Sequence, residues 1–210
     1  MVVDRQFSEP RLAALYDPLC GREERADFRF YLPLVMAAGA VLDVGCGTGA
    51  LLHRDRESGH SGQLGLDPAR GMLQVARTRS DIEWVLGDLA TAAWHREFDL
   101  AVMTGHAFQV LVTDYEIRAA LAAIRTALVP SGVFAFETRN PLNREWARWT
   151  PEYGVEFSDR DGTVVRFETE VDTPVVGDAV RFTNSYRRAD WRKRSAAPAY
   201  CGSRISWTSD

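Results

Sequence analysis

The chain has 210 residues, of which 46% are hydrophobic and 26% are charged, and its 25 basic and 29 acidic groups give a formal net charge of -4. A chain of this length buries roughly 70% of its unfolded surface, enough for one core but hardly for two large domains. The longest apolar stretch, 30–42, contains Pro33 and Gly39 and falls short of the roughly 18 residues of a membrane span. Asp4 and Glu9 precede any apolar run, which is unlike a secretory leader and favours a cytoplasmic location.

Sparing use of cysteine, histidine and lysine excludes several kinds of chemistry. The three cysteines, Cys20, Cys46 and Cys201, form no CxxC pair, which argues against a disulfide framework or a zinc knuckle. The four histidines show no metal-ligand spacing, so no metal site is expected. Lys193 is the only lysine, and it lies in a polar stretch near the end of the chain. A P-loop and a Schiff-base enzyme both need a lysine at the site and are therefore excluded.

Five short apolar segments with strand character recur through the first two thirds of the chain: 41–44, 63–67, 82–86, 98–103 and 132–137. Helical patterns alternate with them, most clearly over 115–128, where the apolar stripe consists of Ile117, Leu121, Ile124 and Leu128. The turn-forming run at 129–132 predicts the end of that helix. Because parallel strands are joined by crossovers that are usually helices, the sequence predicts an α/β fold with a doubly wound, mostly parallel sheet.

After Asn140 the pattern becomes typical of antiparallel structure. Residues 163–171 alternate apolar and charged side chains with a period of two, which indicates a strand with one solvated face. A turn around Pro174 and 177–178 follows, and 179–186 resume a strand-like pattern. We therefore expect an antiparallel hairpin, which either completes an edge of the main sheet or forms a separate cover over a pocket.

The carboxyl end differs sharply from what precedes it. Residues 188–210 show no apolar period and predict a weakly structured tail, and we hypothesise that this tail is truncated or read out of frame. The predicted organisation is a helical lid at 1–40, a binding core at 41–140, the hairpin at 141–187 and the tail at 188–210.

The most informative stretch is Val-Leu-Asp-Val-Gly-Cys-Gly-Thr-Gly-Ala-Leu-Leu at 41–52. An apolar strand runs into Gly45, Gly47 and Gly49, and a helix can begin directly after them. Glycines at these positions allow a sharp turn and a close approach of the backbone to a ligand. The helix start offers unpaired N–H groups to a polar group. A strand-to-helix turn that needs glycines for packing alone is the alternative.

Acidic residues end the next two strands. Asp67 lies 18 residues beyond Gly49, where a right-handed crossover brings its carboxylate beside the first loop, within reach of ribose hydroxyls. A helix N-cap formed by Asp67 before Pro68 is an equally valid interpretation. Asp88 ends the third strand in the same way, although it could also serve only to form a turn. Open parallel sheets bind ligands at this carboxyl edge.

Together these motifs resemble the class I S-adenosylmethionine-dependent methyltransferases. The first loop matches that family's Val-Leu-Asp-Val-Gly-Cys-Gly-Thr-Gly signature, and Gly-Leu-Asp-Pro-Ala-Arg-Gly-Met-Leu at 65–73 contains the acidic residue that holds the ribose. Gly-Asp-Leu at 87–89 matches the position beside the adenine amine, and 98–102 match the fourth strand. Leu-Val-Pro-Ser-Gly-Val at 128–133 matches the turn before the fifth strand, with Ser where the family often has Gly.

The resemblance implies that S-adenosylmethionine is the cofactor. It implies cofactor contacts by Asp43, Gly45, Gly47, Gly49, Asp67, Met72, Asp88, Leu89, Thr104 and His106. The segment 15–34 resembles the lid of small-molecule methyltransferases, so Tyr16 would close over the cofactor and is a candidate catalytic residue. A half-buried aromatic residue that staples the first helix explains Tyr16 equally well.

Methyl transfer from a sulfonium is a direct displacement in which the protein mainly orients and desolvates the reactants. His106, in the loop after the fourth strand, is the best candidate for a base, and a hydrogen-bonded histidine without a proton role is the alternative. A small-molecule acceptor is expected, enclosed between the lid and the hairpin. Nucleic acid is disfavoured because the chain is slightly acidic and its only basic cluster lies at 187–194.

The sequence leaves two alternatives to methyl transfer. A nicotinamide-dependent oxidoreductase is disfavoured because Ala50 stands where its fingerprint needs a glycine, and a Tyr-x-x-x-Lys pair ending at Lys193 is impossible with Ala189 four residues earlier. A catalytically incomplete cofactor-binding protein is the second alternative. It follows from the resemblance, because the family normally closes its sheet with a helix and two further strands.

Overall fold

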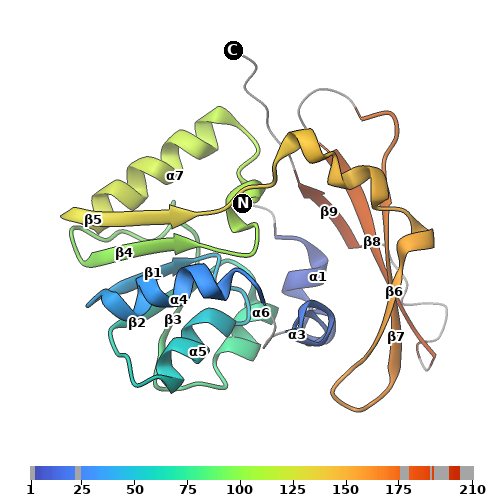
Figure 1. Ribbon diagram of the computed structural model, residues 1–210, viewed down its shortest axis with the longest axis horizontal. Coiled ribbons are helices and arrows are strands. Elements are labelled where there is room, and N and C mark those ends of the chain that lie inside the picture. Colours follow the sequence, from blue (N-terminus) through green and yellow to red (C-terminus); the bar gives the residue numbers. More distant parts are fainter. Residues whose placement is uncertain (1–2, 22–24, 176–179, 190, 192–198, 204–210) are drawn as a thin grey trace.

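Two β-sheets face one another across a layer of short helices (Figure 1). The computed structural model describes residues 3–21, 25–175, 180–189, 191 and the backbone of 199–203. A five-stranded sheet has the order β3-β2-β1-β4-β5, and a four-stranded sheet has the order β6-β7-β8-β9. Among the described residues, no helix combines the length and the hydropathy needed to cross a lipid bilayer.

The five-stranded sheet is parallel throughout and is built from β1 (Val41–Val44), β2 (Gln63–Asp67), β3 (Glu83–Leu86), β4 (Phe98–Met103) and β5 (Leu128–Phe136). Its helices are α4 (Phe28–Ala37), α5 (Ala50–Glu57), α6 (Arg70–Ala76), α7 (Asp114–Ala127) and the 3-10 turn η1 (Ala107–Val110). The predicted α/β class and the doubly wound parallel sheet are confirmed.

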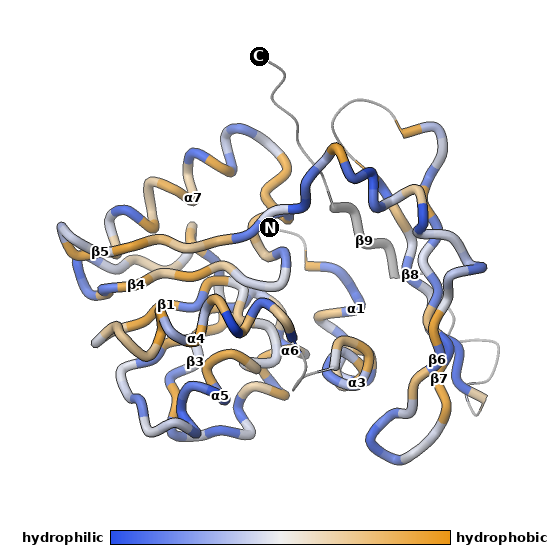
Figure 2. Tube along the Cα trace, viewed as in Figure 1, coloured by the Kyte–Doolittle hydropathy of each residue, from blue (hydrophilic) through white to orange (hydrophobic). Residues whose placement is uncertain are grey.

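Alternate residues of the central strands pack into two separate cores. Val41 of β1 joins Leu51 of α5 and Tyr31 of α4 on one face. Leu42, the next residue, joins Ile124 of α7 on the other face. This alternation follows from the period of two in a strand. Figure 2 shows β4 and β5 hydrophobic along most of their length. The central strand β4 is almost wholly buried, whereas the edge strand β5 leaves Val133 and Phe136 exposed.

The boundary between α7 and β5 differs from the sequence prediction. Thr113 caps α7 in a capping box with Glu116, and the helix ends at Ala127. Leu128 is therefore the first residue of β5 rather than the last of the helical stripe. Phe98 pairs with Leu128 while Leu100 pairs with Val133, so the turn-forming run at 129–132 is a bulge within the strand.

The four-stranded sheet is antiparallel and comprises β6 (Val155–Ser158), β7 (Val164–Val171), β8 (Val180–Arg188) and β9 (Ala199–Ser203). The predicted hairpin is the pair β7-β8. Its place is now decided: the hairpin belongs to a separate sheet and does not extend the edge at β5. The 3-10 turns η2 (Pro141–Asn143), η3 (Glu145–Arg148) and η4 (Pro151–Tyr153) connect the two sheets.

The strand β9 lies inside the tail for which the sequence predicts little structure. Its backbone pairs with β8 from Val180 to Asn184. Residues 190, 192–198 and 204–210 lie outside the described part of the chain. The hypothesis of a truncated or frame-shifted tail therefore stays a prediction.

The helices α1 (Arg5–Ser8), α2 (Pro10–Ala13) and α3 (Tyr16–Cys20) lie between the two sheets (Figure 1). Leu12 and Leu15 pack against Val165 of β7. Ala13 packs against Met72 of α6 on the opposite side. By contrast, α4 is part of the parallel sheet's core, because Tyr31 is 1% exposed there. The predicted lid at 1–40 thus divides into three bridging helices and one core helix.

Candidate active site

A cavity of about 980 Å³ opens between the carboxyl edge of the parallel sheet and the inner face of the antiparallel sheet. Its walls come from the loops that follow the first four strands, from α1 and α3, and from β7 and β8. The volume is at the upper end of the range of about 300 to 1,000 Å³ for small-molecule sites. Such a cavity has room for more than one small ligand.

Most of the residues that the sequence analysis selected meet in this cavity. Its lining includes Tyr16, Gly45, Gly47, Asp67, Met72, Asp88, Leu89, Thr104 and His106. Two selected residues, Asp43 and Gly49, do not line the cavity.

The loop after β1 holds a backbone that glycine alone adopts easily. Gly45 and Gly47 have φ of 72° and 58°. A Cβ on Gly45 would lie 2.7 Å from the Cβ of Ala107, too close for any other residue. The N–H groups of Gly45 and Cys46 both donate to the carbonyl of Leu66, at 2.8 and 3.1 Å. The loop is thereby fixed to the end of β2.

Gly49 serves packing rather than ligand approach. It precedes α5 with φ of 75°, and a Cβ there would lie 2.4 Å from Cη2 of Trp84. A Cβ on Gly65 would lie 2.5 Å from the same indole. The indole of Trp84 therefore fills the space behind the loop, and the third glycine of the motif makes room for it.

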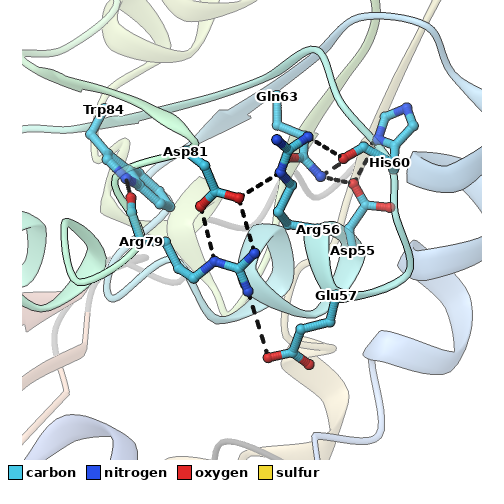
Figure 3. A network of polar contacts seen from close by, with 8 residues as sticks. All are labelled: Asp55, Arg56, Glu57, His60, Gln63, Arg79, Asp81 and Trp84. Atoms are coloured by element: carbon cyan, nitrogen blue, oxygen red, sulfur yellow. Dashed lines mark hydrogen bonds and ion pairs between the residues drawn. The ribbon is translucent and has the colours of Figure 1, made fainter.

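A polar network holds Trp84 in this position (Figure 3). The indole N–H of Trp84 donates to the carbonyl of Arg79 at 2.8 Å. The Arg79 side chain donates to Asp81 at 3.1 Å, and Arg56 of α5 donates to the same carboxylate at 2.8 Å. The chain around Arg79 is thereby tied to α5, which begins at the glycine loop.

Asp67 organises the loop through both carboxylate oxygens. Oδ2 accepts from the N–H of Gly47 at 2.8 Å, and Oδ1 accepts from the N–H of Ala69 at 2.7 Å. The prediction that Asp67 is the N-cap of a helix is wrong, because α6 begins only at Arg70. Asp67 instead forms a turn with Ala69, two residues later. Burial raises the pKa of Asp67 to about 6, against the lowering effect of the two N–H groups. Each oxygen keeps a second lone pair for a ligand in the cavity.

Asp43 is a buried carboxyl group behind the loop. It is 1% exposed, and its Oδ1 has no hydrogen-bond partner among the described residues. Burial raises its pKa to about 7, and the charge of Arg25 opposes that rise. An orphaned acceptor at the end of β1 fits a cationic or hydrogen-bonding ligand group nearby.

Asp88 forms a turn and lines the cavity as well. Its Oδ1 accepts from the N–H groups of Ala90 and Thr91 at 3.0 and 3.1 Å. Partial burial raises the pKa of Asp88, but the hydrogen bonds from Thr91 and Ala90 outweigh it, so the net shift is downward. The turn-forming interpretation of Asp88 is therefore supported, and its carboxylate is ionised at neutral pH.

The loop after β4 presents His106 in an unusual backbone conformation. Gly105 and His106 have φ of 60° and 71°, and the N–H of Gly105 donates to Oε1 of Glu137 at 2.7 Å. Such left-handed residues are enriched at functional sites. Partial burial of the imidazole against the cavity walls has the largest lowering effect on the pKa of His106, and the charge of Arg139 lowers it further. The residue as a whole is nevertheless solvent-exposed. Its imidazole is therefore neutral at pH 7.

Comparison with known proteins agrees with this geometry. The family model described as "Methyltransferase domain" matches residues 41–132, from β1 to the bulge in β5. This part of the chain is therefore similar to methyltransferase domains. Among the solved structures that share the fold, CalS10 is described as bound to S-adenosylmethionine and DhpI as a complex with SAH. No curated protein matches the sequence.

Solved methyltransferases share the fold over most of the chain. DesVI from Streptomyces venezuelae is 24% identical, with a TM-score of 0.71 over 92% of this chain and 84% of DesVI. CalS10, an amino pentose methyltransferase from Micromonospora echinaspora, is 23% identical, with a TM-score of 0.66 over 92% and 82%. The sugar N-methyltransferase KedS8 from Streptoalloteichus is 20% identical, with a TM-score of 0.66 over 91% and 77%.

Arg25 is a cavity residue that the sequence analysis missed. Its guanidinium pairs with Asp27, lies 4.8 Å from the ring centre of Phe28 and approaches Thr104 Oγ1 at 3.5 Å. It thus lies where the loops after β1 and β4 diverge. No local motif marks it, because only the folded chain brings residue 25 to that edge.

Tyr16 lines the cavity next to Cys20. Burial raises the pKa of Tyr16 strongly, so its phenol stays protonated and can only donate or accept a hydrogen bond at neutral pH. The geometry therefore favours a contact or closing role over a base. Among the described residues, no group of three or more His, Cys, Asp or Glu side chains could hold a metal ion.

The antiparallel sheet supplies the far wall of the cavity. Phe167 of β7 contacts Tyr186 of β8 with ring centres 5.0 Å apart. Between such aromatic groups, Thr169 donates to Asn184 at 2.8 Å and Asn184 donates to Gln6 of α1 at 2.9 Å. The wall combines apolar ring faces with buried amides, a surface that suits a small molecule with polar groups on a ring.

Gly49→Ala should destabilise the protein more than Gly59→Ala. Both glycines have positive φ, 75° and 89°, but a Cβ at Gly59 meets nothing within 4 Å. The shared backbone strain costs about 1 kcal/mol, and displacement of Trp84 adds about 1 to 3 kcal/mol for Gly49 alone. Urea unfolding of both variants measures the difference, and equal losses would contradict the packing role of Gly49.

Proposed function

We propose that the protein transfers the methyl group of S-adenosylmethionine to a small-molecule acceptor by direct displacement. One observation carries the proposal: a single cavity extends from the loop at Gly45 and Gly47 to the inner face of the antiparallel sheet at Phe167 and Asn184. A cofactor on that loop would present its methyl group to an acceptor held against the second sheet. Walls on both sides would exclude water from the reaction.

The polar groups at the edge of the parallel sheet fit the parts of the cofactor. We propose that the remaining lone pairs of Asp67 accept from the ribose hydroxyls. Arg25 supplies a cation for the carboxylate of the methionine moiety. The buried carboxyl group of Asp43, whose Oδ1 has no hydrogen-bond partner among the described residues, supplies the opposite charge for the ammonium group of that moiety. Asp88 and Leu89 line the cavity beyond Asp67, where the resemblance puts the adenine.

The bound cofactor supplies an electrophilic methyl group on a sulfonium, and positive charge is lost as it transfers. The protein's part is to orient and desolvate. His106 is proposed as the base for an acceptor that must lose a proton, because a lowered pKa leaves its imidazole neutral. Tyr16 stays protonated and is proposed to close over the cofactor without a proton role.

Amino sugars are the first acceptors to examine. CalS10 and KedS8, which share the fold, are named as methyltransferases of an amino pentose and of a sugar. The amides and aromatic rings of the far wall are compatible with a hydroxylated ring. A nucleic-acid acceptor would need a basic surface, whereas the chain has a formal net charge of -4.

Gly47→Val should abolish binding of S-adenosylmethionine while the far-ultraviolet circular dichroism stays close to that of the wild type. A side chain at Gly47 would meet the Met72 methyl group at 3.4 Å and would project from a backbone with φ of 58°. Isothermal titration with S-adenosylmethionine, with NADH as a negative control ligand, measures the loss. Gly59→Val is the matched control, because Gly59 also has a positive φ but a Cβ there meets nothing within 4 Å. Undiminished affinity in Gly47→Val would contradict the placement of the cofactor.

Cofactor affinity should fall as the pH drops from 8 to 5. Burial gives Asp67 a pKa of about 6 and Asp43 a pKa of about 7, so both carboxylates become protonated over this interval. A protonated carboxyl accepts hydrogen bonds less well, and the loss should reach about tenfold. Titration with S-adenosylhomocysteine at each pH measures it. Asp67→Asn should bind weakly at pH 8 and show a flatter pH profile. A wild-type affinity that does not change between pH 8 and pH 5 would contradict the roles of both Asp67 and Asp43 in binding.

His106→Ala should lower turnover by about 10²-fold or more with an amino-sugar acceptor if the imidazole is the base. The wild-type rate should rise with pH through the lowered pKa of His106, and the variant should lose that dependence. Formation of S-adenosylhomocysteine from pH 4.5 to 9 is the measurement, because the pKa of His106 is lowered from its ordinary value of 6.5. Unchanged turnover across this range would limit His106 to a hydrogen-bonding role. Methylation of RNA with a steep salt dependence would reject the small-molecule acceptor itself.

A further inference from the structure

We call residues 45–49, where we place S-adenosylmethionine, the cofactor loop. Asp17 is a buried carboxylate that contacts this loop from outside the cavity. It lies in α3 and is 8% exposed. Its Oδ1 accepts a hydrogen bond from the hydroxyl of Thr48 at 2.5 Å. Thr48 is 2% exposed and stands between Gly47 and Gly49 in the loop. A charge-assisted hydrogen bond of this length is among the stronger polar contacts available to a protein.

The other oxygen of Asp17 faces the antiparallel sheet. Oδ2 lies 3.7 Å from Nη2 of Arg160, which belongs to the turn between β6 and β7. That turn is braced: Oδ1 of Asp159 accepts from the N–H groups of Asp161 and Thr163, both at 2.9 Å. Oδ2 of Asp159 pairs with Arg188 of β8 at 2.9 Å. Arg160 is therefore presented to Asp17 by a turn that is fixed to the rest of the sheet.

The cofactor loop is thus held by carboxylates from two directions. Asp67 binds the backbone of Gly47 from the end of β2, and Asp17 binds the side chain of Thr48 from α3. Only the second carboxylate also contacts the antiparallel sheet. A buried carboxylate is stable when charged or hydrogen-bonding groups surround it, so loss of Arg160 should weaken the whole arrangement at Asp17.

We propose that Asp17 is a positioning residue that couples the docking of the β6-β7 hairpin to the conformation of the cofactor loop. With the hairpin docked, Arg160 holds Asp17 against Thr48 and the loop keeps its binding conformation. Because coupling free energies are reciprocal, a bound cofactor also holds the hairpin more firmly and completes the wall of the acceptor cavity. The inference depends on the proposed placement of the cofactor at Gly45 and Gly47.

The first test is a charge series at Arg160, which does not line the cavity. Arg160→Ala should weaken binding of S-adenosylhomocysteine by about two- to fivefold, the range of a partly exposed ion pair. Arg160→Lys should stay within about twofold of the wild type, and Arg160→Glu should weaken binding more than Arg160→Ala. Arg187→Ala is the matched control, because Arg187 is an exposed arginine of β8 that pairs with Glu168 and touches neither Asp17 nor the loop.

The second test is a double-mutant cycle between Thr48 and Arg160. Thr48→Val removes the hydroxyl and should weaken binding by about tenfold, and Thr48→Ser should restore it to within about twofold. Arg160→Ala should have little further effect in the Thr48→Val background, because the connection is already broken. Hydrogen exchange of the β6 and β7 amides should slow on addition of S-adenosylhomocysteine in the wild type and not in Asp17→Asn.

The outcomes separate this inference from the proposed function. Wild-type protein that fails to bind S-adenosylhomocysteine, or Gly47→Val that binds it normally, would overturn the cofactor placement. If those results are as expected, equal affinity across the Arg160 series would overturn the coupling. Additive effects of Thr48→Val and Arg160→Ala would also overturn it, since the two groups would then act independently.

Discussion

The hydrogen bond from the N–H of Gly47 to the carboxylate of Asp67, 2.8 Å long, is the contact on which the site depends. It joins the ends of β1 and β2 and orients a backbone that only glycine adopts without strain. The same carboxylate turns the chain toward α6 through Ala69. A single buried acid therefore shapes the loop, turns the chain toward the next helix and offers its remaining lone pairs to the cavity. Burial raises its pKa, so the site combines this role with sensitivity to acid.

The three glycines of the loop, which look equivalent in the sequence, have different structural roles. Gly45 lies against Ala107, Gly47 faces Met72 in the cavity, and Gly49 makes room for Trp84. The polar network of Figure 3 acts on the loop from behind through that indole. Side chains on both sides of the loop thus preserve one backbone geometry, which is the condition for pre-organised binding.

The second sheet encloses the carboxyl edge of the parallel sheet. A parallel sheet alone offers an open edge, but here α1 and α3 and the antiparallel strands enclose that edge. The enclosing wall contains paired amides and aromatic rings, so it suits a small polar ring better than a large polymer. The contacts of Asp17 run from Arg160 beside this wall to Thr48 in the loop at 45–49, as the proposed coupling requires.

The sequence by itself determined the local features. Strand periodicity, the Gly45 to Gly49 run, and Asp67 and Asp88 at the strand ends each follow from a few neighbouring residues. They were sufficient for the α/β class and for a set of candidate residues most of which line the cavity. Tertiary structure decided the rest, because packing partners distant in sequence set it. Leu128 became a strand residue through its pairing with Phe98, and Gly49 became a packing residue through Trp84. Arg25 and Asp17 show no local pattern, since only the folded chain brings them to the edge of the sheet.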